Sequence, residues 1–150
     1  MAPTSEKLTG IVTIWRELAA GGIGPKRDAI TPARLRGTMP WVFLLDVTGE
    51  DFKFRFAGER IIQFMERRLQ GSQLSEHLGT PFFDGMQQFF SRAVRTRTAQ
   101  SYGPGPVTYP GKEHFEMEVM VLPLSDDGHS ISGLLGAFDT WRLGTHSAGR

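Results

Sequence analysis

Few side chains of this 150-residue chain could support metal binding or covalent catalysis, and their spacing favours neither. Cysteine is absent, which excludes disulfides, thiolate metal sites, a nucleophilic cysteine and a flavin–cysteine adduct. Four histidines occur, at His77, His114, His129 and His146. They form no HxH, HxxxH or HExxH pair, so the sequence contains no local metal motif. We expect scattered surface or hydrogen-bonded histidines, and we leave the identity of any cofactor open.

Oxygen nucleophiles and acid–base pairs are equally poorly indicated. No two aspartates are placed by local spacing for acid–base work. The candidate carboxylates are Asp46, Asp51, Asp84, Asp126, Asp127 and Asp139. No serine lies in a GxSxG sequence, and the glycine-rich runs at 21–24 and 103–111 do not lead into a phosphate-binding GK[ST] helix. The sequence therefore predicts no catalytic residue.

The charged residues allow two interpretations. Arg55 could hold a carboxylate ligand through its planar guanidinium, but it alternates with phenylalanines in FKFRF, which favours a cross-strand charge pair. Glu59 would lie favourably in the first turn of a helix. The arginines at 67, 68, 92, 95 and 97 complement the ends of helices, and an acidic or phosphate partner is the alternative.

Composition is that of one globular domain. Hydrophobic residues make up 39% and charged residues 22%, with a net charge of +1, so there is no electrostatic reason to expect nucleic acid. No apolar run approaches the roughly 20 residues that span a bilayer. The first residues do not resemble a secretion signal. We therefore expect a cytoplasmic protein without a membrane span.

The elements that would position these side chains follow from periodicity. Helical spacing predicts helices over 8–20, 59–65 and 82–96, with shorter turns over 32–36 and 74–78. Alternation predicts strands over 41–47, 52–57, 100–109, 115–121 and 131–141. The third of these contains GPGP, which suits an edge position.

The second predicted strand and its end carry two specific expectations. Strict alternation in FKFRF places Phe52, Phe54 and Phe56 on one face of the sheet. Gly58, where the strand gives way to a helix, is expected to take a backbone conformation that other residues resist.

The predicted architecture is α+β, with five antiparallel strands, a helical insertion after the second strand and an additional helix at the N-terminus. Its apolar stripes would meet between the sheet and the inserted helices. The candidate ligand pocket consists of Phe54, Phe56, Met65, Phe83, Met86, Phe90, Met117, Val119 and Leu135. The alternative is that these side chains simply fill the core.

The order of elements and several segments resemble a known family. These segments are IWRELAAGG, PKRDAITPARLRGTMPWVFLLDV, FKFRFAGERI, RLQG and LPLSDDG. In this order they resemble the compact single-domain PAS_5 family of PAS domains, found in alphaproteobacteria. We expect the chain to divide into an N-terminal helix and linker (1–28), a PAS-like domain (29–143) and a flexible tail (144–150).

The resemblance implies a signalling module rather than an enzyme. PAS domains bind small molecules between sheet and helices, or dimerise, so we expect a sensor of a small apolar ligand, an adaptor for a signalling protein, or both. The apolar stripe Ile11, Ile14, Trp15 and Leu18 could pack on the sheet or form a homodimer interface. The alternatives are a ligand-free dimeric interaction module and an enzyme of a cone-shaped α+β fold, which would use a buried Asp46, Asp139 or His114.

Overall fold

A single antiparallel sheet organises the molecule. We analysed a computed structural model, which describes residues 5–144. The strands are β1 (Val42–Thr48), β2 (Asp51–Ala57), β3 (Gln100–Pro106), β4 (Phe115–Leu124) and β5 (Gly133–Arg142). They lie in the order β2-β1-β5-β4-β3 with every pair antiparallel. The predicted α+β class and five-stranded sheet are confirmed, and the GPGP strand lies at an edge, as predicted.

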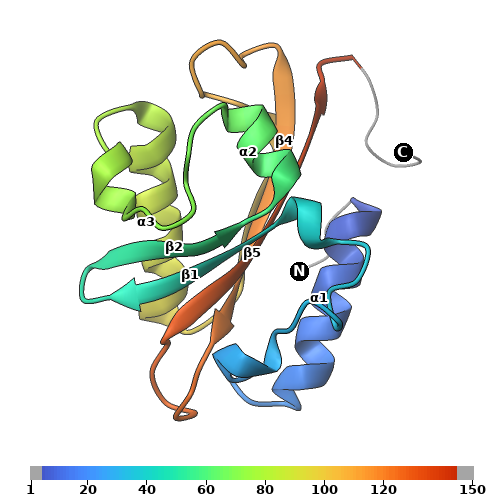
Figure 1. The fold of residues 1–150 in the computed structure, drawn as a ribbon, viewed down its shortest axis with the longest axis vertical. Coiled ribbons are helices and arrows are strands. Elements are labelled where there is room, and N and C mark those ends of the chain that lie inside the picture. Colours follow the sequence, from blue (N-terminus) through green and yellow to red (C-terminus); the bar gives the residue numbers. More distant parts are fainter. Residues whose placement is uncertain (1–4, 145–150) are drawn as a thin grey trace.

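Helices cover both faces of this sheet (Figure 1). One face carries α1 (Glu6–Ala19), and the other carries α2 (Glu59–Met65), the short 3₁₀ helix η3 (Leu74–His77) and α3 (Pro81–Thr96). Two further 3₁₀ turns, η1 (Arg27–Ala29) and η2 (Met39–Trp41), lie in the connection from α1 to β1. Among residues 5–144, no helix has the length and hydropathy required to cross a lipid bilayer.

The central strands bury both faces, so two apolar clusters form. The cluster beneath α2, η3 and α3 contains most of the phenylalanines, including Phe43, Phe54 and Phe90. The cluster beneath α1 contains Leu8 and Ile11 from the helix. In β4, every residue from Met117 to Leu124 is buried. From Val119 to Leu124 the residues facing either way are apolar, so this part of the strand shows no hydrophobic alternation.

A β-bulge at Arg55 changes which face of the sheet the last residues of β2 point to. Leu45 pairs with Phe54 and Leu44 pairs with Phe56, so Arg55 is the extra residue of the bulge. As a result, Phe54 contributes to the cluster beneath α2 and α3, whereas Phe56 packs against the cluster beneath α1. The prediction that all three phenylalanines of FKFRF share one face was wrong, because it assumed an unbroken pleat.

Gly58 joins β2 to α2, and its role differs from the predicted one. Its φ is −68°, which any residue adopts, so the expected unusual backbone conformation is absent. The requirement is instead one of space. A Cβ atom at this position would lie 2.3 Å from the Met39 carbonyl oxygen and 2.5 Å from that of Pro40. Glycine therefore allows the start of α2 to pass directly over η2.

Candidate functional site

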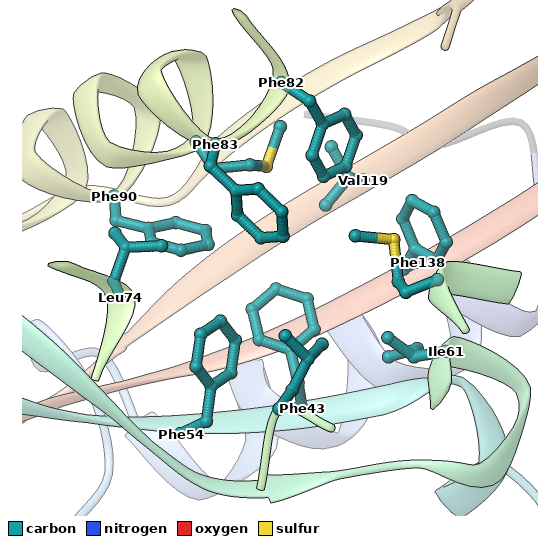
Figure 2. Close-up of a pocket in the computed structure, with 12 residues that line it drawn as sticks. Phe43, Phe54, Ile61, Leu74, Phe82, Phe83, Phe90, Val119 and Phe138 are labelled. Atoms are coloured by element: carbon teal, nitrogen blue, oxygen red, sulfur yellow. The ribbon is translucent and has the colours of Figure 1, made fainter. Parts of the chain in front are cut away.

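An apolar cavity lies between the sheet and the helices α2, η3 and α3 (Figure 2). Its volume is about 40 Å³ and no polar surface lines it. The sheet contributes side chains from β1, β2, β4 and β5, and the helices close the other side. The lining residues are Phe43, Phe54, Ile61, Met65, Leu69, Leu74, Phe82, Phe83, Met86, Phe90, Val119 and Phe138.

The predicted pocket residues divide into two groups. Phe54, Met65, Phe83, Met86, Phe90 and Val119 all line this cavity, whereas Phe56, Met117 and Leu135 do not. Sequence reasoning missed several lining residues. Ile61 and Phe82 lie on predicted apolar helix faces, and this signal could have identified them. Phe43 and Phe138 lie in strands buried on both faces, where no alternation shows which way a side chain points.

The three residues outside the cavity have definite positions. Leu135 belongs to the cluster beneath α1, because alternation along β5 directs Leu134 and Phe138 to the cavity face and Leu135 to the opposite one. Phe56 lies on that same opposite face because of the bulge at Arg55. Met117 faces the correct side but lies nearer the β3 edge, where it lines a separate groove against α3. Phe56 and Leu135 therefore do not belong to this pocket, contrary to the prediction.

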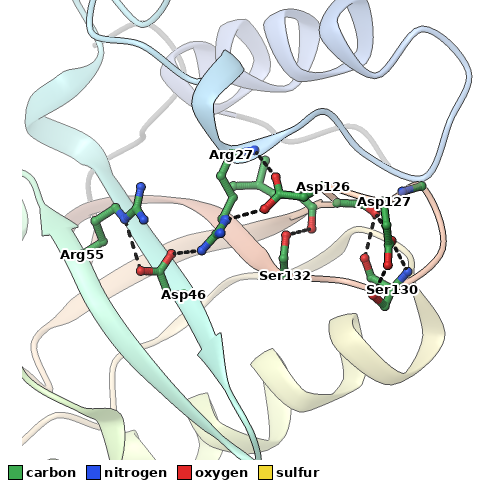
Figure 3. Close-up of polar contacts among 10 residues, drawn as sticks. Arg27, Asp46, Arg55, Asp126, Asp127, Ser130 and Ser132 are labelled. Atoms are coloured by element: carbon green, nitrogen blue, oxygen red, sulfur yellow. Dashed lines mark hydrogen bonds and ion pairs between the residues drawn. The ribbon is translucent and has the colours of Figure 1, made fainter.

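A chain of ion pairs links the connection between α1 and β1 to the sheet (Figure 3). Arg27 donates from Nη1 to Asp46 Oδ1 at 3.0 Å and from Nε to Asp126 Oδ2 at 2.9 Å. The bond to Asp46, and next the bond to Asp126, raise the pKa of Arg27. Arg55 donates from Nε to Asp46 Oδ2 at 3.2 Å. The cross-strand pairing predicted for Arg55 is thus confirmed.

The two aspartates of the LPLSDDG segment are held by backbone groups. Asp126 accepts the Arg27 N–H at 3.0 Å, and this bond, together with the Arg27 guanidinium, lowers the pKa of Asp126. Asp127 accepts the N–H groups of Ser130 and His129, each at 2.8 Å. These bonds hold the pKa of Asp127 far below its usual range.

The network joins three of the segments that suggested the family resemblance. Arg27 and Asp46 come from PKRDAITPARLRGTMPWVFLLDV, Arg55 from FKFRFAGERI and Asp126 from LPLSDDG. Each of these charges has a partner of opposite sign. The arrangement therefore fastens the connection between α1 and β1 to the sheet.

Comparison with known proteins agrees with these features. A family model described as a PAS domain, PAS_5, matches residues 3–139. The chain belongs to this family. The predicted recognition is confirmed, and the match includes the N-terminal helix that the predicted division set apart as 1–28. A comparison with curated proteins finds no match.

Two solved structures are similar to this PAS domain. A sensory box sensor histidine kinase from Vibrio cholerae has a TM-score of 0.47 and 18% identity, with 70% of this chain and 86% of that chain covered. A fungal LOV domain photoreceptor has a TM-score of 0.47 and 19% identity, with 67% of this chain and 74% of that chain covered.

His77 packs against the cavity wall of this PAS domain. Its ring stacks on Phe83 with centroids 5.1 Å apart. Arg67 Nη1 lies 3.2 Å from Nδ1, so Nδ1 accepts, and Nε2 donates to Ser72 Oγ at 2.8 Å. Ser72 in turn donates to the Leu69 carbonyl. Burial, and next the positive charge of Arg67, lower the pKa of His77 from its ordinary 6.5. Both effects favour the neutral imidazole.

Stability should depend on pH through His77. Because the pKa of His77 is lower in the folded state, the unfolded state binds more protons between the two pKa values. The free energy of unfolding should fall as pH decreases from about 6.5 towards the folded pKa. Urea unfolding between about pH 7.5 and 5 measures this slope, and His77→Gln should flatten it. An unchanged slope in His77→Gln would show that another group is responsible.

The residues considered for enzymatic acid–base chemistry lie outside the cavity. Asp46 is paired with Arg27 and Arg55, and His114 is exposed. Asp139 is buried but accepts from Ser5 Oγ at 2.9 Å, beside the first turn of α1. Within the described residues, no side chain lining the cavity can titrate, and no cluster of three or more His, Asp or Glu could hold a metal ion.

The predicted dimer stripe packs on the sheet within one chain. Ile11 has no exposed surface, and Trp15 Nε1 donates to the Pro123 carbonyl at 2.8 Å. Ile14, Trp15 and Leu18 are partly buried against the same cluster. Ile11 is therefore too deeply buried to contact a second copy, contrary to the prediction. The predicted tail, 144–150, falls almost entirely outside the described residues, as does His146.

Proposed function

We propose that this PAS domain is a signalling module in which a small apolar ligand, bound between sheet and helices, alters the surface presented to a protein partner. The observation that carries the proposal is the cavity itself. Its lining comes from the sheet and from the helical cover, and all of it is apolar. An apolar molecule would gain contacts there, whereas a polar one would lose its hydrogen bonds to water.

The volume of the cavity limits what could bind. About 40 Å³ exceeds the roughly 10–15 Å³ needed for one water but is far below the ~300 Å³ of typical ligand pockets. A ligand of more than a few atoms would require the cover to move. The cover suits such movement, because α2 and η3 are short and Met65 and Met86 carry adaptable thioethers. A ligand that binds the opened arrangement better would shift the population towards it.

Titration with xenon and with toluene tests ligand binding, using methyl NMR of ¹³C-labelled methionine. We expect saturable shifts of the Met65 and Met86 methyl signals, since both side chains line the cavity. Met120 provides the internal control, because it is fully buried in the cluster beneath α1. Shifts that fail to saturate, or that affect Met120 equally, would contradict a specific site in this cavity.

A ligand-free interaction module is the second candidate, and the small cavity volume favours it. In that case the aromatic side chains fill the core and the surface alone binds the signalling partner.

We also propose a homodimer in the cytoplasm, with the partly exposed Ile14, Trp15 and Leu18 of α1 in its interface. Light scattering on the purified chain measures the dimer directly, and a monomer at all concentrations would exclude it.

A further inference from the structure

A second and larger concavity lies where β5 extends beyond β1. Val42, the first residue of β1, pairs with Ala137, so the residues of β5 after Ala137 have only β4 as a strand neighbour. The groove beside them has a volume of about 520 Å³, within the range of small-molecule sites.

Three parts of the fold build this groove. They are the first turn of α1, the helix α2 with the η2 turn that packs against it, and the last residues of β5 beside the start of β4. The side chains that matter for its chemistry are cationic or aromatic: Lys7, Trp41, Arg60, Phe64, Phe115 and Arg142.

Cations lie over aromatic rings in this groove. Lys7 Nζ is 4.7 Å from the centre of the Trp41 ring, and the Arg60 guanidinium is 5.6 Å from the same ring. Arg142 lies over Phe115 at 5.2 Å. Within residues 5–144, neither Lys7 nor Arg60 forms an ion pair with a carboxylate. Their charges are therefore oriented by tryptophan and not neutralised by an acid.

The acidic groups near the groove are already engaged. Asp139 has 3% of its surface exposed and accepts from Ser5 Oγ at 2.9 Å and from the Thr140 N–H at 3.0 Å. Glu116 accepts from Trp141 Nε1 at 3.2 Å. The groove thus presents positive charge beside aromatic surface, although the whole chain carries only +1.

The groove is separate from the apolar cavity. Phe138 lines both, and the Phe64 ring meets it edge-on with centroids 5.5 Å apart. On α2, Ile61 and Met65 line the cavity, whereas Arg60 and Phe64 line the groove. Side chains of one helix and one strand therefore divide two sites of different chemistry.

We propose that this groove binds a small organic anion with an aromatic body, its carboxylate near Lys7 and Arg60 and its ring against the aromatic side chains. The charges select an anion, since a neutral molecule would gain nothing from them. The rings supply apolar contact area and stacking. This proposal does not depend on ligand binding in the apolar cavity.

Isothermal titration calorimetry with 4-phenylbutyrate and with the neutral 4-phenylbutan-1-ol tests it. We expect the acid to bind at least about tenfold more tightly than the alcohol, and more weakly when salt is raised to about 0.5 M. The double variant Lys7→Gln/Arg60→Gln should lose at least about tenfold in affinity. The matched control is Lys26→Gln/Arg36→Gln, which removes two exposed charges outside the groove and should bind as the original chain does.

A second measurement locates the bound acid. Trp41 and Trp141 line the groove, whereas Trp15 packs against the cluster beneath α1 and bonds to Pro123. Trp15→Phe therefore leaves only groove tryptophans to report, and saturable fluorescence changes in that variant would support the proposal. The proposal would be overturned if the acid and the alcohol bound with equal affinity, or if Lys7→Gln/Arg60→Gln bound the acid as tightly as the original chain does. It would also be overturned if the acid did not bind at millimolar concentration, or if a polyglutamate peptide bound in its place.

Discussion

Replacing Phe43 with alanine is expected to lower the free energy of unfolding by about 3–5 kcal/mol. The side chain is 5% exposed and its ring contacts those of Phe54 and Phe90, with centroids 6.5 and 5.8 Å away. It also covers Gly136, where a Cβ atom would lie 2.0 Å from the ring. Truncation removes these contacts and enlarges the existing cavity. Urea denaturation measures the loss.

The same variant should gain affinity for apolar ligands. The enlarged cavity would remain apolar, and toluene at about one hundred times its Kd would restore about 2.7 kcal/mol. Phe56→Ala is the matched control, because Phe56 packs on the opposite face of the sheet. It should be less destabilised and should show no restoration by toluene. Equal restoration in both variants would argue against a ligand-accessible space beside Phe43.

Gly58→Ala is the second substitution with a large expected effect, about 2–3 kcal/mol of lost stability. The added methyl would approach the Met39 oxygen, the Pro40 oxygen and the Pro40 carbonyl carbon to 2.3, 2.5 and 2.6 Å. These are backbone atoms, so relief requires α2 or η2 to move. Thermal and urea unfolding measure the change.

Gly85→Ala should change the free energy of unfolding in the opposite direction. Gly85 lies inside α3 and a Cβ atom there would meet nothing within 4 Å, so alanine should stabilise the chain by about 0.5–1 kcal/mol. If both variants lost stability equally, the close approach at Gly58 would not be the cause of its effect.

Local patterns were sufficient for the three α-helices and the five strands, but they did not predict the 3₁₀ helices η1 and η2. The spacing of apolar residues located α1, α2 and α3, and proline and glycine marked their ends, because helix periodicity and turn chemistry are properties of neighbouring residues. The predicted strand over 100–109 ends earlier, at Pro106, and that over 131–141 begins later, at Gly133. Such boundaries depend on strand pairing, which is not local.

The cavity could be predicted only in part for the same reason. Helix residues such as Phe83, Met86 and Phe90 were found because one helix face is apolar and the other polar. Leu135 was misplaced because both faces of β5 are buried. Phe56 was misplaced because the bulge at Arg55 arises from pairing with β1.

The sequence by itself determined the order of elements, the α+β class, the family resemblance and the apolar character of the space beneath α3. Tertiary structure alone decided which apolar side chains face that space, because sheet pairing sets the phase of each strand. It also brought Lys7, Arg60 and Arg142 to one groove, although the first and last of these lie near opposite ends of the chain. Cations so distant in sequence converge only when α1, α2 and β5 are packed together.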